Sequence, residues 1–110
     1  MNIYAIADQV GNVKIGIAGN PESRRAALQT GNAQWLQLIG HSSCDEPRVA
    51  EDHIHYCMRD IGLLERGEWL KPSIATTVIA SAIASDDIST ACQVAMDFWC
   101  ASQMPTNAST

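Results

Sequence analysis

Two short segments near the start of the chain, in which apolar residues alternate, constrain its fold most strongly. Residues 2–8 (NIYAIAD) and 13–18 (VKIGIA) both show the period-two pattern of strands with two different faces. Residues 9–12 (QVGN) between them have turn chemistry, since Gly11 can adopt a positive φ. The pattern predicts an antiparallel β-hairpin. Gly16, inside the second strand, indicates that another group approaches the backbone there.

The residues after the hairpin predict a helix and a third strand. Asn20 is a suitable N-cap, Pro21 is favoured at the first helical position, and Gly31 is a suitable stop. Residues 33–40 (AQWLQLIG) alternate again and predict a strand. Residues 41–47 are expected to form a polar loop.

The remainder of the chain predicts three further helices. Apolar positions recur at helical spacing in residues 47–61, 73–84 and 86–103. Residues 63–72 read as a loop or a short edge strand. We therefore expect an α+β fold, in which a three-stranded antiparallel sheet has flanking helices and a C-terminal helical pair is added. The expected organisation is a domain over residues 1–72, a helical extension over 73–103 packed on it or on a partner, and a flexible tail over 104–110.

Length and charge restrict the kind of protein. A chain of 110 residues suits one small domain rather than a multidomain enzyme. Its net charge is −5, and all seven Lys and Arg residues lie between Lys14 and Lys71. Proteins that bind the phosphate backbone usually show a basic patch. Such a patch would have to be local here.

Cysteine spacing and hydropathy exclude several other classes. No CxxC pair occurs among the four cysteines, which excludes a zinc ribbon and a thioredoxin-type site. No apolar run reaches the roughly 20 residues of a membrane span. The start of the chain lacks the pattern of a secretory signal. We expect a cytoplasmic protein that does not interact with membranes.

Several segments in a fixed order resemble a known family. Residues 2–4 (NIY) and 14–16 (KIG) are similar to the paired-strand signature of GIY-YIG endonucleases. More narrowly, residues 13–32 (VKIGIAGNPESRRAALQTGN), 50–55 (AEDHIH) and 66–70 (RGEWL) resemble the small T5orf172 and meiotically up-regulated gene 113 branch, found in phage and bacterial genomes. The resemblance covers roughly residues 2–72 and implies the GIY-YIG-like fold.

The resemblance also implies metal-assisted hydrolysis of a DNA phosphodiester. In that chemistry Tyr4 would help to deprotonate the attacking water, and Arg24 would steady the charge of the transition state. Glu51 would bind one divalent ion, Mg²⁺ or Mn²⁺, through the hard oxygen ligands that such ions prefer.

Further positions match the family's motif one by one. Lys14 stands where a second tyrosine is common, although lysine is usual in this branch, and Gly16 matches the motif glycine. His55 matches a histidine one helical turn after the glutamate. The remaining matches are the supporting pair Glu68 and Trp69, and Arg25 is a further candidate for contact with nucleic acid. Leu28, by contrast, falls where many GIY-YIG enzymes have a histidine.

Ordinary structural roles compete with these assignments. Tyr4 could be a strand tyrosine with a surface hydroxyl, and Trp35 and Trp69 suit packing better than base stacking. His53 and Cys57 have metal-pair spacing but lack a third ligand. The C-terminal helices, with Trp99, are expected either to cover the sheet or, as we favour, to form a homodimer interface.

Two functions from different classes remain open. The leading one is a small metal-dependent DNA endonuclease or nickase, with DNA as its partner. The alternative is a catalytically reduced module that binds a protein as an inhibitor or adaptor, which a phage could carry. The net charge of −5 favours the second, whereas the presence of Tyr4, Arg24 and Glu51 together favours the first.

Overall fold

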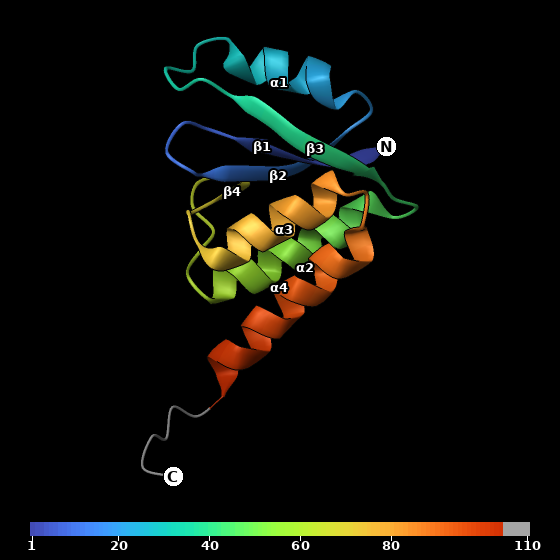
Figure 1. Cartoon of the computed structure of the whole chain (residues 1–110), viewed down its shortest axis with the longest axis vertical. Coiled ribbons are helices and arrows are strands. Elements are labelled where there is room, and N and C mark those ends of the chain that lie inside the picture. The colour runs from blue at the N-terminus through green and yellow to red at the C-terminus, as the bar shows by residue number, and fades with distance from the viewer. Residues whose placement is uncertain (105–110) are drawn as a thin grey trace.

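The computed structural model describes residues 1–104, so most of the tail predicted over residues 104–110 lies outside the described part. The chain begins with two strands and ends with two helices, and strands and helices alternate between them (Figure 1). Their bounds are β1 Asn2–Ala7, β2 Val13–Ala18, α1 Pro21–Gln29, β3 Gln37–Ser43, α2 Pro47–Asp60, β4 Trp69–Leu70, α3 Ile74–Ala84 and α4 Ile88–Gln103.

The sheet confirms the predicted hairpin and adds one strand to the prediction. Its order is β3-β1-β2-β4 with antiparallel neighbours, and Tyr4 of β1 lies opposite Gly16 of β2. The expected three-stranded sheet is wrong because Trp69 and Leu70 of β4 pair with β2. Two residues are too few for alternation to reveal a strand.

The third strand begins and ends later than its alternation predicts. Residues 33–36 form a loop because Gln29, the last residue of α1, satisfies their backbone. Its side chain accepts from the Leu36 N–H at 2.8 Å and donates to the Gln34 carbonyl at 2.9 Å. At the other end the chain continues to pair with β1 as far as Ser43, opposite Asn2. The polar loop expected to begin at residue 41 therefore starts after Ser43.

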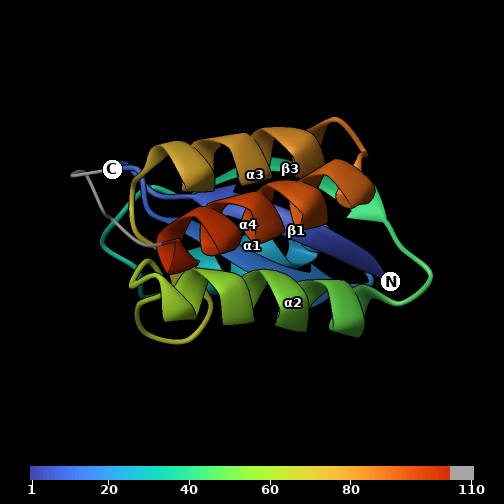
Figure 2. The ribbon, with the colours of Figure 1, turned by 90° about the horizontal axis from the view of Figure 1, so that it is seen from below.

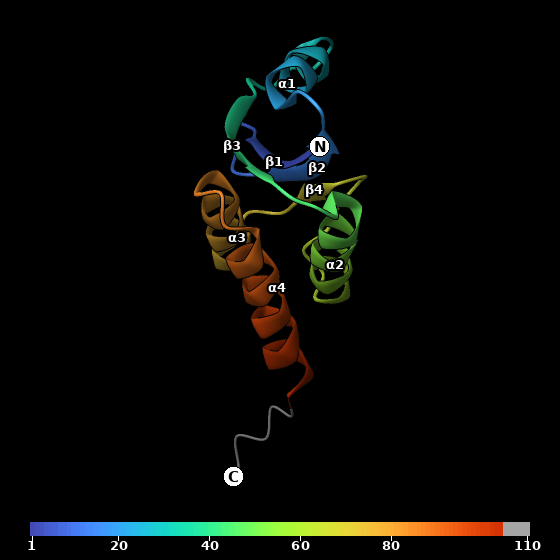
Figure 3. The ribbon, with the colours of Figure 1, turned by 90° about the vertical axis from the view of Figure 1, so that its right-hand side faces the viewer.

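Helices cover both faces of the sheet, but unequally. Figure 3 shows α1 on one face and α2 and α3 on the other, while α4 packs against α2 and α3 and extends away from the sheet. The larger apolar cluster fills the space between the sheet and these three helices. On the α1 face the buried apolar residues are Tyr4, Ile6 and Leu36.

Of the two C-terminal helices, α3 covers the sheet within one chain, as in the first of the two expected arrangements, whereas α4 packs on α2 and α3. α2, α3 and α4 lie side by side in the view from below (Figure 2). Asp86 ends α3 in the left-handed region, at φ 57°, and its carboxylate accepts from the Ser42 hydroxyl at 2.8 Å and the Ser43 N–H at 3.1 Å. These bonds fix the turn between α3 and α4 to β3. The homodimer stays a prediction.

Residues 1–104 contain no helix that is both long enough and apolar enough to span a membrane.

Candidate functional site

The side chain of Tyr4 lies across the backbone of β2, and Gly16 makes this possible. Tyr4 is only 1% exposed, and its cross-strand partner is Gly16. A Cβ atom on residue 16 would overlap the Tyr4 hydroxyl and would lie 2.6 Å from Cζ of the ring. The approach to the backbone expected at Gly16 is therefore that of the tyrosine itself. The phenol therefore lies over Gly16 of β2.

Glu68 meets the phenol at the same point. Its Oε1 would lie 2.8 Å from a Cβ at Gly16, so both oxygens converge over the glycine. The Ile15 N–H donates to the Glu68 carbonyl at 3.0 Å, which anchors this segment just before β4. Lys14, itself buried, places Nζ 3.2 Å from Glu68 Oε1 and 5.7 Å from the centre of the Trp69 ring.

Helix α2 brings Glu51 and His55 to this edge of β2. The two residues are one helical turn apart, as their spacing predicts, and both are buried. His55 Nε2 donates to the Ile15 carbonyl at 2.8 Å. Burial lowers the pKa of His55, although this hydrogen bond opposes the shift. The imidazole is therefore neutral at pH 7 and fastens α2 to β2 next to Gly16.

Glu51 is held in an environment that opposes its negative charge. Burial raises its pKa to about 7, and the neighbouring Glu68 carboxylate adds to the shift. Glu51 Oε2 has no hydrogen-bond partner within residues 1–104, although it is buried. A buried carboxylate oxygen without a partner is unfavourable unless a proton or a cation is also bound.

Arg24 reaches the same site from α1. The helix begins where predicted, because the Asn20 side chain accepts from the Ser23 N–H at 3.1 Å. Four residues after that cap, the Arg24 guanidinium lies close enough to the Tyr4 hydroxyl to affect its pKa. Burial raises the pKa of Tyr4, and Arg24 works in the opposite direction. The phenol is thus protonated at neutral pH, with a cation beside its oxygen.

Arg25 lies apart from this group, whereas Leu28 is an apolar neighbour of Tyr4's cluster. The Arg25 side chain is bound to Glu22 at 2.6 and 2.9 Å, and it borders a different depression, next to Trp35. Leu28 packs in the small apolar cluster of the α1 face. The role of Arg25 in binding nucleic acid stays a prediction.

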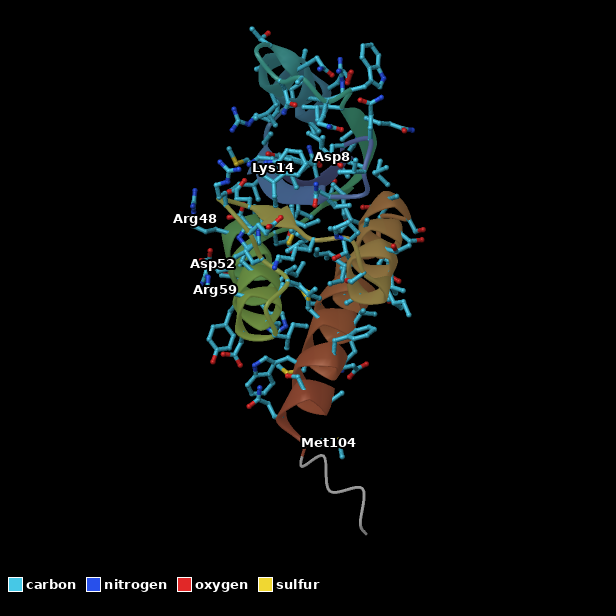
Figure 4. The ribbon with its side chains drawn as sticks, turned by 90° about the vertical axis from the view of Figure 1, so that its left-hand side faces the viewer. Asp8, Lys14, Arg48, Asp52, Arg59 and Met104 are labelled. Atoms are coloured by element: carbon cyan, nitrogen blue, oxygen red, sulfur yellow. The ribbon has the colours of Figure 1, made fainter. Side chains whose placement is uncertain are left out.

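Two arginines of α2 belong to the surroundings of the site, although neither is part of the family motif. Arg48 opposes the rise in the pKa of Glu51, whereas Arg59 acts with burial to lower the pKa of His55. Figure 4 shows both arginines, with Asp52 between them, on the outer side of α2 below Lys14. Their positions, three residues before Glu51 and four after His55, are the signal that could have found them.

The described residues form no preassembled metal cage. Among residues 1–104 no group of three or more His, Cys, Asp or Glu side chains is arranged to hold an ion. His53 and Cys57, considered above as a metal pair, have Nε2 and Sγ 4.0 Å apart. His53 Nε2 also lies 3.2 Å from the Cys92 carbonyl oxygen, to which it can donate. That contact accounts for His53 as a structural residue.

The assembled edge consists of a phenol beside a guanidinium, an imidazole fixed to the backbone, and two carboxyl groups next to a lysine. Residues 2–89 match the family described as the T5orf172 domain, so the chain belongs to that family, the GIY-YIG-like branch that the motifs resemble. The match extends past residue 72 and through α3, and the division predicted at residue 72 stays a prediction. No curated protein and no solved structure matches the chain.

Proposed function

We propose that this protein is a metal-dependent nuclease that hydrolyses a phosphodiester bond of DNA. The observation that carries the proposal is that Arg24 and Glu51 both lie close enough to Tyr4 to influence the pKa of its hydroxyl, so the three candidate residues are neighbours beside β2. Family membership agrees with a nuclease-like domain. Nothing in the composition alone would point to this activity.

The residues present fit a divalent cation of the Mg²⁺ type. Glu51 Oε2 is a buried hard oxygen that lacks a partner among the described residues. Glu68 places a second carboxylate next to it. Mg²⁺ commonly keeps several waters and is held by one or two carboxylates plus substrate phosphate, so the lack of a three-residue cage is compatible with one Mg²⁺ or Mn²⁺ ion. When bound, the ion would supply a Lewis acid at the phosphoryl oxygen.

The protein's own groups have separable tasks in this proposal. In its phenolate form, which the neighbouring Arg24 favours, Tyr4 would take the proton of the attacking water and become the neutral phenol, and Arg24 would also stabilise negative charge on the phosphate. Lys14 neutralises Glu68 when no substrate is bound. His55 positions Glu51 by fixing α2 to β2.

The proposal requires DNA to approach a protein whose net charge is −5. All of its lysines and arginines lie within residues 14–71, which include every candidate site residue except Tyr4, whereas residues 72–110 contain three aspartates and no basic residue. Lys14, Arg48 and Arg59 lie on one side of the molecule (Figure 4). Binding through this local basic surface should weaken steeply as salt is raised.

The test is nicking of supercoiled plasmid at low ionic strength, with Mg²⁺ or Mn²⁺, by wild type and by Glu51→Gln. Glu46→Gln is the matched control, because Glu46 is exposed at the start of the same helix and its side chain makes no capping bond. Cleavage by wild type and the control, but not by Glu51→Gln, is the expected result. Nicked rather than linear product would identify a nickase.

The alternative function, a protein-binding inhibitor or adaptor, rests on the negative net charge and on Leu28 in place of a second active-site histidine. A wild-type protein that leaves the plasmid intact with both ions, under conditions in which it is folded, would exclude the nuclease and favour this alternative.

A further inference from the structure

A polar depression adjoins the proposed site on the side of the β1–β2 turn. Its volume is about 480 Å³, and it is lined by residues of the turn, the α1–β3 loop and the segment before β4. Small-molecule sites commonly have volumes of roughly 300–1,000 Å³. Lys14 borders this depression and is also bound to Glu68, so the depression lies beside the proposed site.

In two asparagines of the wall, one polar atom of the side-chain amide makes no hydrogen bond within the described chain. Asn12 donates from Nδ2 to Asp8 Oδ2 at 2.8 Å, which leaves its Oδ1 without a hydrogen bond in the described chain. Asn32 accepts at Oδ1 from the Gln34 N–H at 2.8 Å, and its Nδ2 donates to no described residue. The wall therefore offers one acceptor and one donor, which is the combination that the edge of a nucleobase can satisfy.

The other walls supply positive charge and an aromatic ring. Arg66 and Lys14 contribute the cations, and Trp69 contributes the ring. Two acids, Asp8 and Glu65, also line the depression. The Asp8 carboxylate is already bound by the Val10 and Asn12 N–H groups as well as by the Asn12 amide. This near balance of charge suits one nucleotide better than a run of phosphates.

We infer that the depression receives one unpaired nucleotide of the DNA strand, next to the phosphate that is cleaved. The inference rests on the proposed nuclease function for the position of that phosphate. The base would contact Trp69 and exchange hydrogen bonds with Asn12 and Asn32, and its phosphate would lie toward Lys14 and Arg66. A paired base is excluded, because its hydrogen-bonding edge and its stacking faces are already occupied in the duplex.

The test uses two labelled duplexes of the same sequence, one fully paired and one with a single unpaired nucleotide. Binding is measured by fluorescence anisotropy in EDTA on the Glu51→Gln background, so that no cleavage takes place. We expect tighter binding of the duplex with the unpaired nucleotide. Asn32→Asp keeps the acceptor for Gln34 but removes the free donor, and it should weaken that binding by about tenfold. Arg66→Gln should act in the same direction.

Gln37→Glu is the charge control for Asn32→Asp, because it adds the same charge at an exposed position of β3 outside the depression. It should change binding of the two duplexes equally. An unpaired base that lies against Trp69 should quench the fluorescence of this tryptophan. Trp69→Phe, which keeps an aromatic ring, should abolish that quenching.

Equal binding of the two duplexes, or equal effects of Asn32→Asp and Gln37→Glu, would overturn the nucleotide site. The result is independent of the nuclease test. Cleavage without a preference for the unpaired nucleotide would leave the nuclease and remove this site, whereas the preference without cleavage would keep the site and remove the nuclease.

Discussion

The two faces of the sheet differ in what they bury. On the side of α2, α3 and α4, sixteen buried apolar residues of the described chain form one cluster, whereas the α1 side has three. The proposed site lies at the edge of β2, where Tyr4 comes from the α1 face and Glu51 from a helix of the opposite face. One face thus supplies most of the burial that stabilises the fold.

The site, by contrast, contains groups that the fold does not satisfy. Glu51 has a buried oxygen without a described partner and a pKa raised to about 7. Such groups reduce stability, and their retention is typical of functional sites. The comparison therefore predicts that substitutions on the apolar face change stability alone, and that substitutions at the edge change activity.

The largest effect should come from Glu51→Gln. We expect cleavage to fall by at least about 10³-fold, because the ion loses its carboxylate. The melting temperature of the metal-free protein should rise by a few degrees, since a buried acid is replaced by a neutral amide. Plasmid cleavage and thermal unfolding measure the two quantities, with Glu46→Gln as the control. A lower melting temperature would contradict the view that Glu51 is a destabilising group.

Ile79→Ala should lower stability and leave cleavage unchanged, the opposite of what is expected for Glu51→Gln. Ile79 is fully buried in the larger apolar cluster, so its truncation should lower the free energy of unfolding by about 2–5 kcal/mol. Cleavage per folded molecule should be unchanged below the melting temperature. Val78→Ala, at the neighbouring 38% exposed position, should cost less than about 1 kcal/mol. Chemical denaturation of both variants tests the contrast, and equal losses would contradict it.

Gly16→Ala should disturb both properties. The new methyl group must displace the Tyr4 phenol, with a stability loss of about 1–3 kcal/mol. The displaced hydroxyl should reduce cleavage by about 10²-fold. Gly19→Ala is the control, because no atom lies within 4 Å of a Cβ at that position. If Gly16→Ala cleaves as well as Gly19→Ala, the position of the phenol does not matter for activity.

Both stability and cleavage should depend on pH through the titration of Glu51. Between the ordinary glutamate value of 4.5 and about 7 the folded protein retains the Glu51 proton that the unfolded chain has lost. Stability should therefore decrease as pH rises through this range, and Glu51→Gln should remove this part of the decrease. Cleavage should increase about tenfold per pH unit below 7, as Glu51 ionises. Denaturation and cleavage at matched pH values test both signs.

The smallest effect is expected at Trp99. Its Nε1 donates to Asp60 at 2.7 Å and its ring lies near Tyr56, but the side chain is only half-buried. Trp99→Phe should lower the free energy of unfolding by about 0.5–1.5 kcal/mol and leave cleavage unchanged. Sedimentation of both proteins across a dilution series tests the predicted homodimer. A monomer at every concentration would leave α4 as a cover within one chain.

Local pattern determined the elements of this protein. Alternation in residues 2–8 and 13–18 predicted the hairpin, Asn20 and Pro21 predicted the start of α1, and helical spacing predicted α2, α3 and α4. These features depend on residues a few positions apart, so the sequence alone determines them. The same spacing placed Glu51 and His55 on one face of α2.

Only the tertiary structure decided what these elements bring together. β4 exists because β2 offers it a partner, and β3 is displaced toward its C-terminal end because Gln29 binds the loop before it. The sequence identifies Glu68, but its approach to Tyr4 over Gly16, and to Glu51, depends on pairing between distant segments. The raised pKa of Glu51 follows from that same burial and proximity, which no local pattern encodes.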